Sequence, residues 1–175
     1  MTINLGPIIP GMDGYDPVST DHYAYNPRCL RRDLTSYATT NWMTTSALLN
    51  ITTGPSSHSI ADFQNELQGR TAENYLGMHS SGHFAVGGDA SDFFTSTNDP
   101  SFFLHHAMLD NVYWIWQSLH LDQAEEIAGT ITMFDNPPSR DAVVEDELDM
   151  KNLEDKIRIK DALSTMRGKF CYIYE

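Results

Sequence analysis

The central helix of the fold is predicted by one stretch, NDPSFFLHHAMLDNVYWIWQSL at residues 98–119. Asp99 followed by Pro100 is a strong helix start, because it offers a capping carboxylate and then a proline at the first helical position. The residues that follow are apolar on nearly every side, which is typical of a helix buried all round. We therefore expect a buried helix over residues 100–119.

Other helices and a loop-rich periphery are predicted around it. Three further helices are expected over residues 35–49, 57–68 and 72–84, the middle one with an apolar stripe at 3–4 spacing. Gly54-Pro55 and Gly69 end the first two of these. The alternating runs Ile157/Ile159 and Phe170/Tyr172/Tyr174 predict short strands. The expected fold class is mainly α, with the 72–84 and 100–119 helices antiparallel and facing each other.

Composition narrows the class of protein. The chain has 175 residues, and 11 basic minus 24 acidic side chains give a net charge of −13. A chain of this length forms one domain with a real core. Strong acidity argues against nucleic acids or anionic membranes as partners. No apolar run approaches the ~20 residues of a membrane helix, and the opening MTINLGPIIPG lacks the features of a secretory signal.

The histidines carry the functional signal. His79 and His83 are four residues apart, so on one helix they share a face and can grip one metal ion. His105 and His106 lie in the middle of the predicted buried helix, about 100° apart, so only one of them can face a given metal. Asp110, one turn after His106, is placed to orient an imidazole. Three neutral imidazoles suit copper, zinc or iron.

The motifs around these histidines resemble a known family. MHSSGHFAVGG at residues 78–88 and NDPSFFLHHAMLDNVYWIWQ at residues 98–117 are similar to the second copper-binding half of tyrosinases, a family that includes catechol oxidases and haemocyanins. The resemblance implies half of a type-3 copper four-helix bundle. It also implies that His79, His83 and His106 hold one copper of the family's two. His105 would be a non-ligand beside the site.

The same resemblance implies a substrate entrance. Ser80 and Phe84 directly follow the first two ligands and would line it, and Phe93 or Phe94 would overhang it. Members that act strongly on monophenols often have Asn where this chain has Ser80. The resemblance therefore favours oxidation of o-diphenols to o-quinones with dioxygen over hydroxylation of monophenols.

The first copper site of the family has no counterpart in the sequence. Only His22 and His58 precede His79, and neither lies in a copper motif. We expect residues 1–175 to be the C-terminal part of a tyrosinase copper-binding domain that needs an upstream half. It would comprise a lead-in loop over 1–33, a helical copper-binding region over 34–129, and a loop and short-strand tail over 130–175. A degenerate one-copper relative and a homodimer of half-bundles are the alternatives.

Two function classes follow. The first is a copper polyphenol oxidase of the catechol-oxidase type, acting on small phenols with dioxygen once its other half is present. The second is a non-catalytic module that holds one metal ion or recruits a partner.

Two cysteines and a sequon bear on the compartment. Cys29 and Cys171 are disulfide candidates, either with each other or with a segment not present here, and they resemble those of short secreted fungal forms. Asn50 begins an N-glycosylation sequon, which is used only in secreted proteins. Secretion is expected if the native full-length protein carries a signal that this chain lacks.

Overall fold

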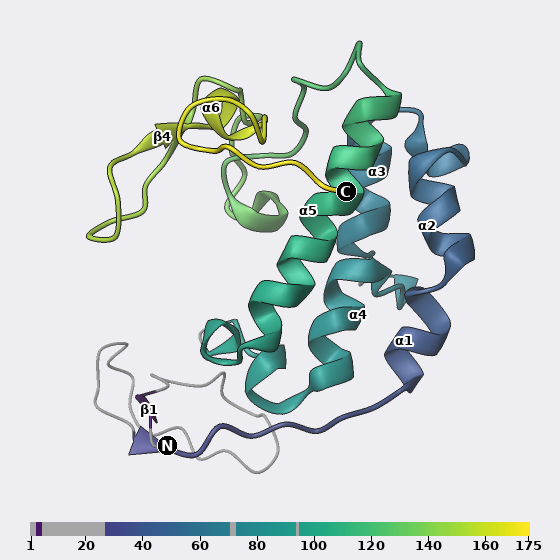
Figure 1. The fold of residues 1–175 in the computed structure, drawn as a ribbon, viewed down its shortest axis with the longest axis vertical. Coiled ribbons are helices and arrows are strands. Elements are labelled where there is room, and N and C mark those ends of the chain that lie inside the picture. Colours follow the sequence, from purple (N-terminus) through teal and green to yellow (C-terminus); the bar gives the residue numbers. More distant parts are fainter. Residues whose placement is uncertain (1–2, 5–26, 71–72, 94) are drawn as a thin grey trace. The chain divides into compact units, whose positions relative to one another are not determined.

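The protein is mainly helical in the computed structural model, which describes residues 3–4, 27–70, 73–93 and 95–175 (Figure 1). The helices are α1 (Tyr37–Trp42), α2 (Thr45–Thr52), α3 (Ile60–Gln68), α4 (Gly77–Val86), α5 (Ser101–Leu119) and α6 (Ile159–Ala162). Strand β1 (Ile3–Asn4) pairs antiparallel with β2 (Pro27–Arg28), and β3 (Glu147–Leu148) pairs antiparallel with β4 (Ile157–Arg158). This confirms the predicted fold class, and α3 and α5 lie close to their predicted bounds.

Two local predictions of secondary structure are wrong. The expected helix over 35–49 is broken between α1 and α2, where the Thr44 hydroxyl accepts a hydrogen bond from the backbone N–H of Ala47 at 3.1 Å and so caps a new helix. Residues 170–175 form no strand. Their backbone instead turns back on the preceding loop, with the Tyr172 N–H donating to the Thr165 carbonyl at 3.1 Å.

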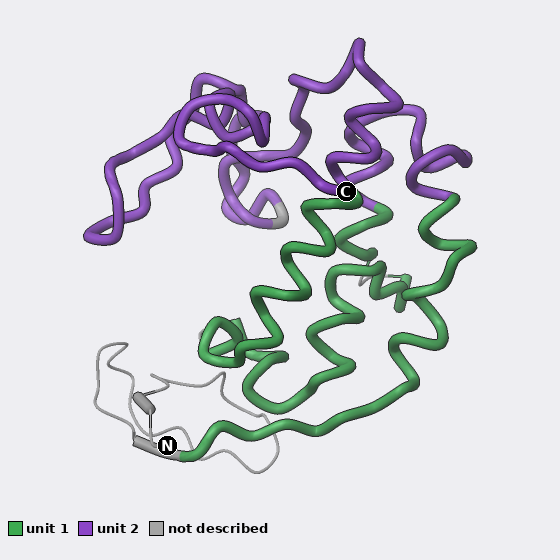
Figure 2. Tube along the Cα trace, in the orientation of Figure 1, with its two compact units in different colours: residues 1–49, 66–112 green, residues 50–65, 113–175 purple. Residues whose placement is uncertain are grey.

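The chain divides into two compact units (Figure 2), of which residues 1–49 and 66–112 form the first. This unit holds α1, α4 and the first part of α5. The segment that leads into α1 runs along the end of α4, because the N–H groups of Asp33 and Thr35 donate to the carbonyls of Val86 and Ala85, each at 2.9 Å. Its buried apolar side chains include Ala38, Met78 and Leu109.

The second unit, residues 50–65 and 113–175, has its own aromatic core. Trp116 is fully buried, its ring centroid lies 5.1 Å from that of Phe63, and its indole N–H donates to the Ser57 carbonyl at 3.0 Å. Burial of Trp116 therefore leaves no unpaired indole N–H.

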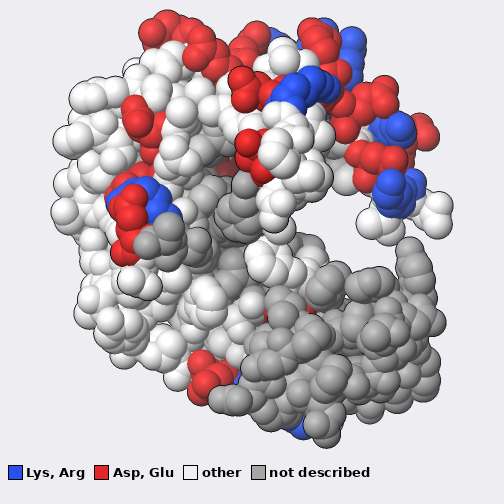
Figure 3. All heavy atoms as spheres, turned by 180° about the vertical axis from the view of Figure 1, so that it is seen from behind, with Lys and Arg blue, Asp and Glu red and all other residues white. Residues whose placement is uncertain are grey.

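A charged tail completes the second unit. Acidic and basic side chains gather over it (Figure 3) in exposed pairs that include Arg140 with Asp146 and Lys160 with Glu145. Exposed pairs each contribute about 0–1 kcal/mol. The Gln117 side-chain amide attaches the segments that follow α5 to this helix, because it donates to the carbonyls of Ala124 and Leu163. Within the described residues, no helix combines the length and apolarity needed to cross a bilayer.

Helix α5 is not buried all round, contrary to the prediction. Leu109, Val112 and Trp116 are buried, but Phe103 and Leu104 are 64% and 76% exposed. The described part of the chain covers only one side of the helix at its N-terminal half, so the apolar pattern of α5 exceeds what these described residues bury.

The N-terminus of α5 is fixed by Asp99, as its capping signal predicts. The buried Asp99 carboxylate accepts hydrogen bonds from the backbone N–H of Ser101 at 2.9 Å and from its hydroxyl at 2.8 Å. Arg32 forms a bidentate pair with the same carboxylate at 2.7 and 2.8 Å. These hydrogen bonds, that from Arg32 above all, hold the pKa of Asp99 well below its usual range.

Replacing Asp99 by Asn should therefore destabilise the protein by about 2 kcal/mol, since asparagine can still cap the helix but loses the negative charge that pairs with Arg32. A depressed carboxyl pKa stabilises the fold above the unfolded-state value of about 4, and this contribution disappears as the pH falls. Urea unfolding at several pH values should show the wild type and D99N converging below about pH 4.

Asp122→Asn, at an exposed position after α5, is the matched control and should leave stability unchanged. A constant difference between wild type and D99N down to low pH would show that the ionised carboxylate does not stabilise the helix start.

Candidate metal centre

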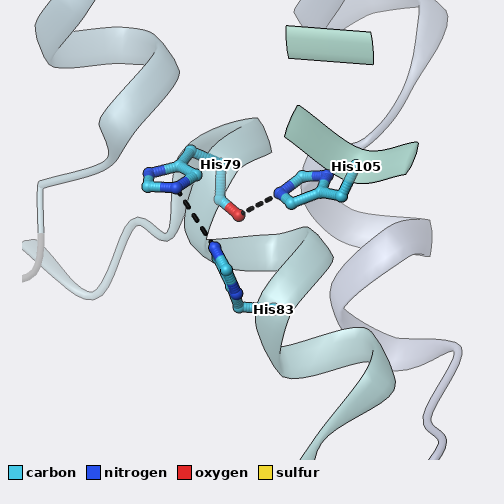
Figure 4. Close-up of side chains that lie close together, drawn as sticks. All are labelled: His79, His83 and His105. Atoms are coloured by element: carbon cyan, nitrogen blue, oxygen red, sulfur yellow. Dashed lines mark hydrogen bonds between the residues drawn. The ribbon is translucent and has the colours of Figure 1, made fainter. Parts of the chain in front are cut away.

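Four imidazoles from two helices meet in the first unit. His79 and His83 project from α4 and His105 from α5 (Figure 4), and His106 is the next residue of α5. The Nε2 atom of His83 lies 3.2 Å from Nε2 of His79 and 3.2 Å from Nε2 of His106. The i, i+4 spacing on α4 and the position of His106 on α5 thus bring two further ring nitrogens within 3.2 Å of His83 Nε2.

The outer ring nitrogens fix the tautomers of both α4 histidines. His83 Nδ1 lies 2.8 Å from the Ala90 carbonyl oxygen, and His79 Nδ1 lies 2.5 Å from the Gln68 side-chain oxygen. Both oxygens only accept hydrogen bonds, so each Nδ1 carries the proton of the neutral ring. The two Nε2 atoms consequently face each other with lone pairs and no proton between them, which is the arrangement that a bound cation satisfies.

The electrostatic setting keeps the rings of His79 and His106 neutral. Burial lowers the pKa of His79 to about 4, and the imidazoles of His83, His106 and His105 act in the same direction. Burial also lowers the pKa of His106 to about 4, with His83 and His105 adding to the effect. Neutral imidazoles are the protonation state that binds metal, so the residues fit one ion of copper or a similar transition metal.

His105 and His106 offer alternative third ligands. Ring nitrogens of His79, His83 and His105 all lie within 4.8 Å of one another. However, His105 Nε2 lies 2.8 Å from the His79 backbone carbonyl, to which it donates (Figure 4). That bond leaves only its Nδ1 with a lone pair, whereas His106 Nε2 directly faces His83 Nε2. His106 therefore remains our expected third ligand.

The sequence around this cluster is matched by one family. The common central domain of tyrosinase matches residues 1–119, which is more than half of the chain. The chain belongs to the tyrosinase family. Family membership explains why the HSSGH helix, the Gly87-Gly88 loop and the DPSFFLHH helix occur together in this chain. Copper is the metal that this family uses.

Individual tyrosinase relatives extend this likeness over nearly the whole chain. N-acetyl-6-hydroxytryptophan oxidase of Emericella nidulans is 31% identical over 168 residues, which cover 92% of this chain and 46% of the relative. Tyrosinase P of Aspergillus terreus is 28% identical over 180 residues, which cover 98% and 48%. A mutant polyphenol oxidase from Thermothelomyces thermophila has a similar solved structure, with a TM-score of 0.91, 31% identity, and coverage of 100% of this chain and 49% of that one. This tyrosinase chain thus spans about half the length of these relatives.

Gly82 is a site residue that sequence reasoning missed. A Cβ atom at this position would overlap the His105 ring, so α4 and α5 approach closely only because Gly82 has no side chain. Gln68 and Ala90, whose oxygens bond the outer nitrogens of His79 and His83, were missed as well. Neither oxygen has a sequence signal, because each is brought to its histidine by a turn of the chain.

The predicted substrate-entrance residues lie on or after α4. The Ser80 hydroxyl donates to the Gln68 carbonyl at 2.9 Å, and Phe84 is 48% exposed. Phe93 is 76% exposed, while Phe94 lies outside the described residues. Asp110 follows His106 by one turn of α5. The roles of these residues stay predictions.

The remaining predicted residues lie outside the histidine motifs of α4 and α5. Cys29 and Cys171 are exposed free thiols. The Asn50 amide, in the last turn of α2, donates to the Ser56 hydroxyl at 3.0 Å. His58 is exposed, His22 lies outside the described residues, and His120 Nδ1 donates to the Trp116 carbonyl at 2.8 Å, as expected of a histidine at a helix end.

Gly82→Ala should destabilise the protein, although alanine favours a helix by about 1 kcal/mol over glycine. The added methyl group must displace the His105 ring, and overpacking of this kind costs about 1–3 kcal/mol. Urea unfolding measures the net loss. The neighbouring Ser81→Ala is the control, because the buried Ser81 hydroxyl has no hydrogen-bond partner among the residues that the structure describes, and its removal should be neutral or stabilising. Equal effects at both positions would refute the close contact.

His106→Gln should abolish copper binding, whereas His105→Gln should retain it, because a glutamine amide can still donate to the His79 carbonyl. Copper bound per chain after loading and desalting measures this, with about one ion expected in the wild type. His120→Gln, at the far end of α5, is the control. Retention by the His106 variant together with loss in the His105 variant would make His105 the third ligand.

Proposed function

We propose that this chain supplies one copper half-site of an enzyme that oxidises o-diphenols to o-quinones with dioxygen. The observation that carries the proposal is that the Nε2 atoms of His79 and His106 each lie 3.2 Å from His83 Nε2, with the outer nitrogens of the two α4 histidines bonded to oxygen acceptors. Membership of the tyrosinase family supports the choice of copper over other metals.

Bound copper supplies the redox chemistry that passes electrons from phenol to oxygen. Two o-diphenols lose four electrons and four protons, which reduce one dioxygen to two waters. The chain's own part is to hold the imidazoles neutral and fixed in orientation, and to present an aromatic wall. Phe84, next to His83 and half exposed, suits the flat face of a phenol.

The substrate class follows from the same residues. Ser80 stands where members with strong monophenol activity often have Asn, so we propose diphenol oxidation as the main reaction. One relative is named an N-acetyl-6-hydroxytryptophan oxidase, which supports a hydroxylated aromatic compound as the natural substrate. Secretion, which Cys29, Cys171 and the Asn50 sequon would suit, also remains a proposal.

A second half completes the site in this proposal. Exposed apolar side chains surround the imidazoles in sequence, namely Phe84, Phe93, Phe103 and Leu104. Several large apolar side chains left exposed in one compact unit are typical of a surface that another protein segment covers. The relatives are about twice as long as this chain, which supports an upstream half as the covering segment.

A non-catalytic metal-binding module is the second candidate. It is favoured by a specific observation, because within the described part of the chain the histidine cluster on α4 and α5 is the one group placed to hold a metal. A module of this kind would bind one ion and carry out no oxygen chemistry.

Oxygen uptake with catechol separates the two candidates. We expect the copper-loaded chain alone to be inactive, and the chain completed by an upstream half with the first copper site to consume oxygen. His106→Ala should abolish that uptake, whereas His120→Ala on the same helix should not. Absence of uptake by the completed protein would contradict the oxidase proposal, and quinone formation by the chain alone would contradict the need for another half.

A further inference from the structure

The junction between α3 and α4 is a tight crossing that glycine makes possible. Gly69 and Gly77 have φ angles of +100° and +63°, which L side chains rarely adopt. A Cβ atom on Gly77 would lie 2.6 Å from both the Glu66 carbonyl oxygen and the Gly69 nitrogen. The end of α3 and the start of α4 thus meet backbone to backbone.

Polar contacts lock this crossing. The Tyr75 hydroxyl donates to Glu66 Oε1 at 2.6 Å, and Arg70 pairs with the other oxygen of the same carboxylate. The Arg70 guanidinium also lies 4.3 Å from the centroid of the Tyr75 ring. The last turn of α3 is therefore held at a set position against the first turn of α4.

Gln68, in that last turn, contacts α4 in two ways. Its side-chain oxygen lies 2.5 Å from His79 Nδ1, and its backbone carbonyl accepts the Ser80 hydroxyl at 2.9 Å. Only the first contact depends on the identity of the side chain. A substitution at Gln68 can thus remove the bond to His79 while leaving the bond from Ser80 in place.

We propose that Gln68 is a positioning residue for His79, which rests on the proposed function of His79 as a metal ligand. The amide oxygen holds the proton on Nδ1, and this turns the Nε2 lone pair towards His83 Nε2 at 3.2 Å. Because the acceptor is uncharged, it sets the tautomer and orientation of the ring without adding a negative charge beside the metal.

Three variants isolate this role. Gln68→Leu removes the acceptor at similar size, and Gln68→Glu keeps an acceptor oxygen. Gln123→Leu is the matched control, because the Gln123 amide also makes side-chain hydrogen bonds, to the backbone groups of Ile60 and His58, but lies in the second unit. Circular dichroism checks that each variant folds.

The first readout is the tautomer of His79 in the metal-free chain, from ¹⁵N NMR of the imidazoles. We expect the Nδ1–H form in the wild type, Gln68→Glu and Gln123→Leu, and a shift towards Nε2–H in Gln68→Leu. The second readout is copper(I) affinity by competition with a chelator. Loss of a partner of this kind weakens metal binding about 10–100-fold, which we expect for Gln68→Leu alone.

The results of these experiments test the positioning role of Gln68 separately from the proposed function. An Nε2–H tautomer of His79 in the wild type, or no change of tautomer in Gln68→Leu, overturns the positioning role. If Gln68→Leu does not fold, the wild-type tautomer and the Gln68→Glu variant still decide the matter. Failure of the completed protein to oxidise catechol, with the tautomer shift observed, overturns the proposed function and leaves the positioning role of Gln68 intact.

Discussion

The structure depends on one constraint, which is that the Nε2 atoms of His79 and His83 lie 3.2 Å apart with their lone pairs facing each other. Two neutral acceptors at this distance gain nothing from each other, so the surrounding fold must hold them there. Oxygen acceptors on Ala90 and Gln68 bond the outer nitrogens and prevent each ring from turning to a more favourable partner. The arrangement is pre-formed for a cation, and the low pKa of His79 keeps protons from taking that place.

Close backbone approach is the means by which the fold meets this constraint. Gly82 lets the His105 ring lie against α4, where it donates to the His79 carbonyl and ties the two helices together. Gly69 and Gly77 let α3 reach the start of α4. Asp99 and Arg32 fix the residue at which α5 begins, and this sets the position of His106 along the helix axis. Small and charged residues thus position the imidazoles, while apolar packing holds each unit together.

The chain is also incomplete as an apolar structure. Helix α5 carries more apolar residues than the described part of the chain buries, and Phe103 and Leu104 remain exposed beside the histidines. A tyrosinase chain that spans about half of its relatives' length is expected to leave such a face. In the function we propose, the chemistry is incomplete in the same way, because one set of three imidazoles would hold one of the two copper ions in the family's site.

The sequence by itself determined the features that depend on neighbours along the chain. The Asp99 cap, the bounds of α5 and the shared face of His79 and His83 follow from local hydrogen bonding and the 3.6-residue helical period, which tertiary contacts do not alter. Only the tertiary structure decided the irregular course of residues 170–175 and the oxygen partners of His79 and His83. Gln68 lies 11 residues from His79, and a glycine-dependent crossing brings the two together. No periodicity records such a contact, because it depends on how close two backbones can approach.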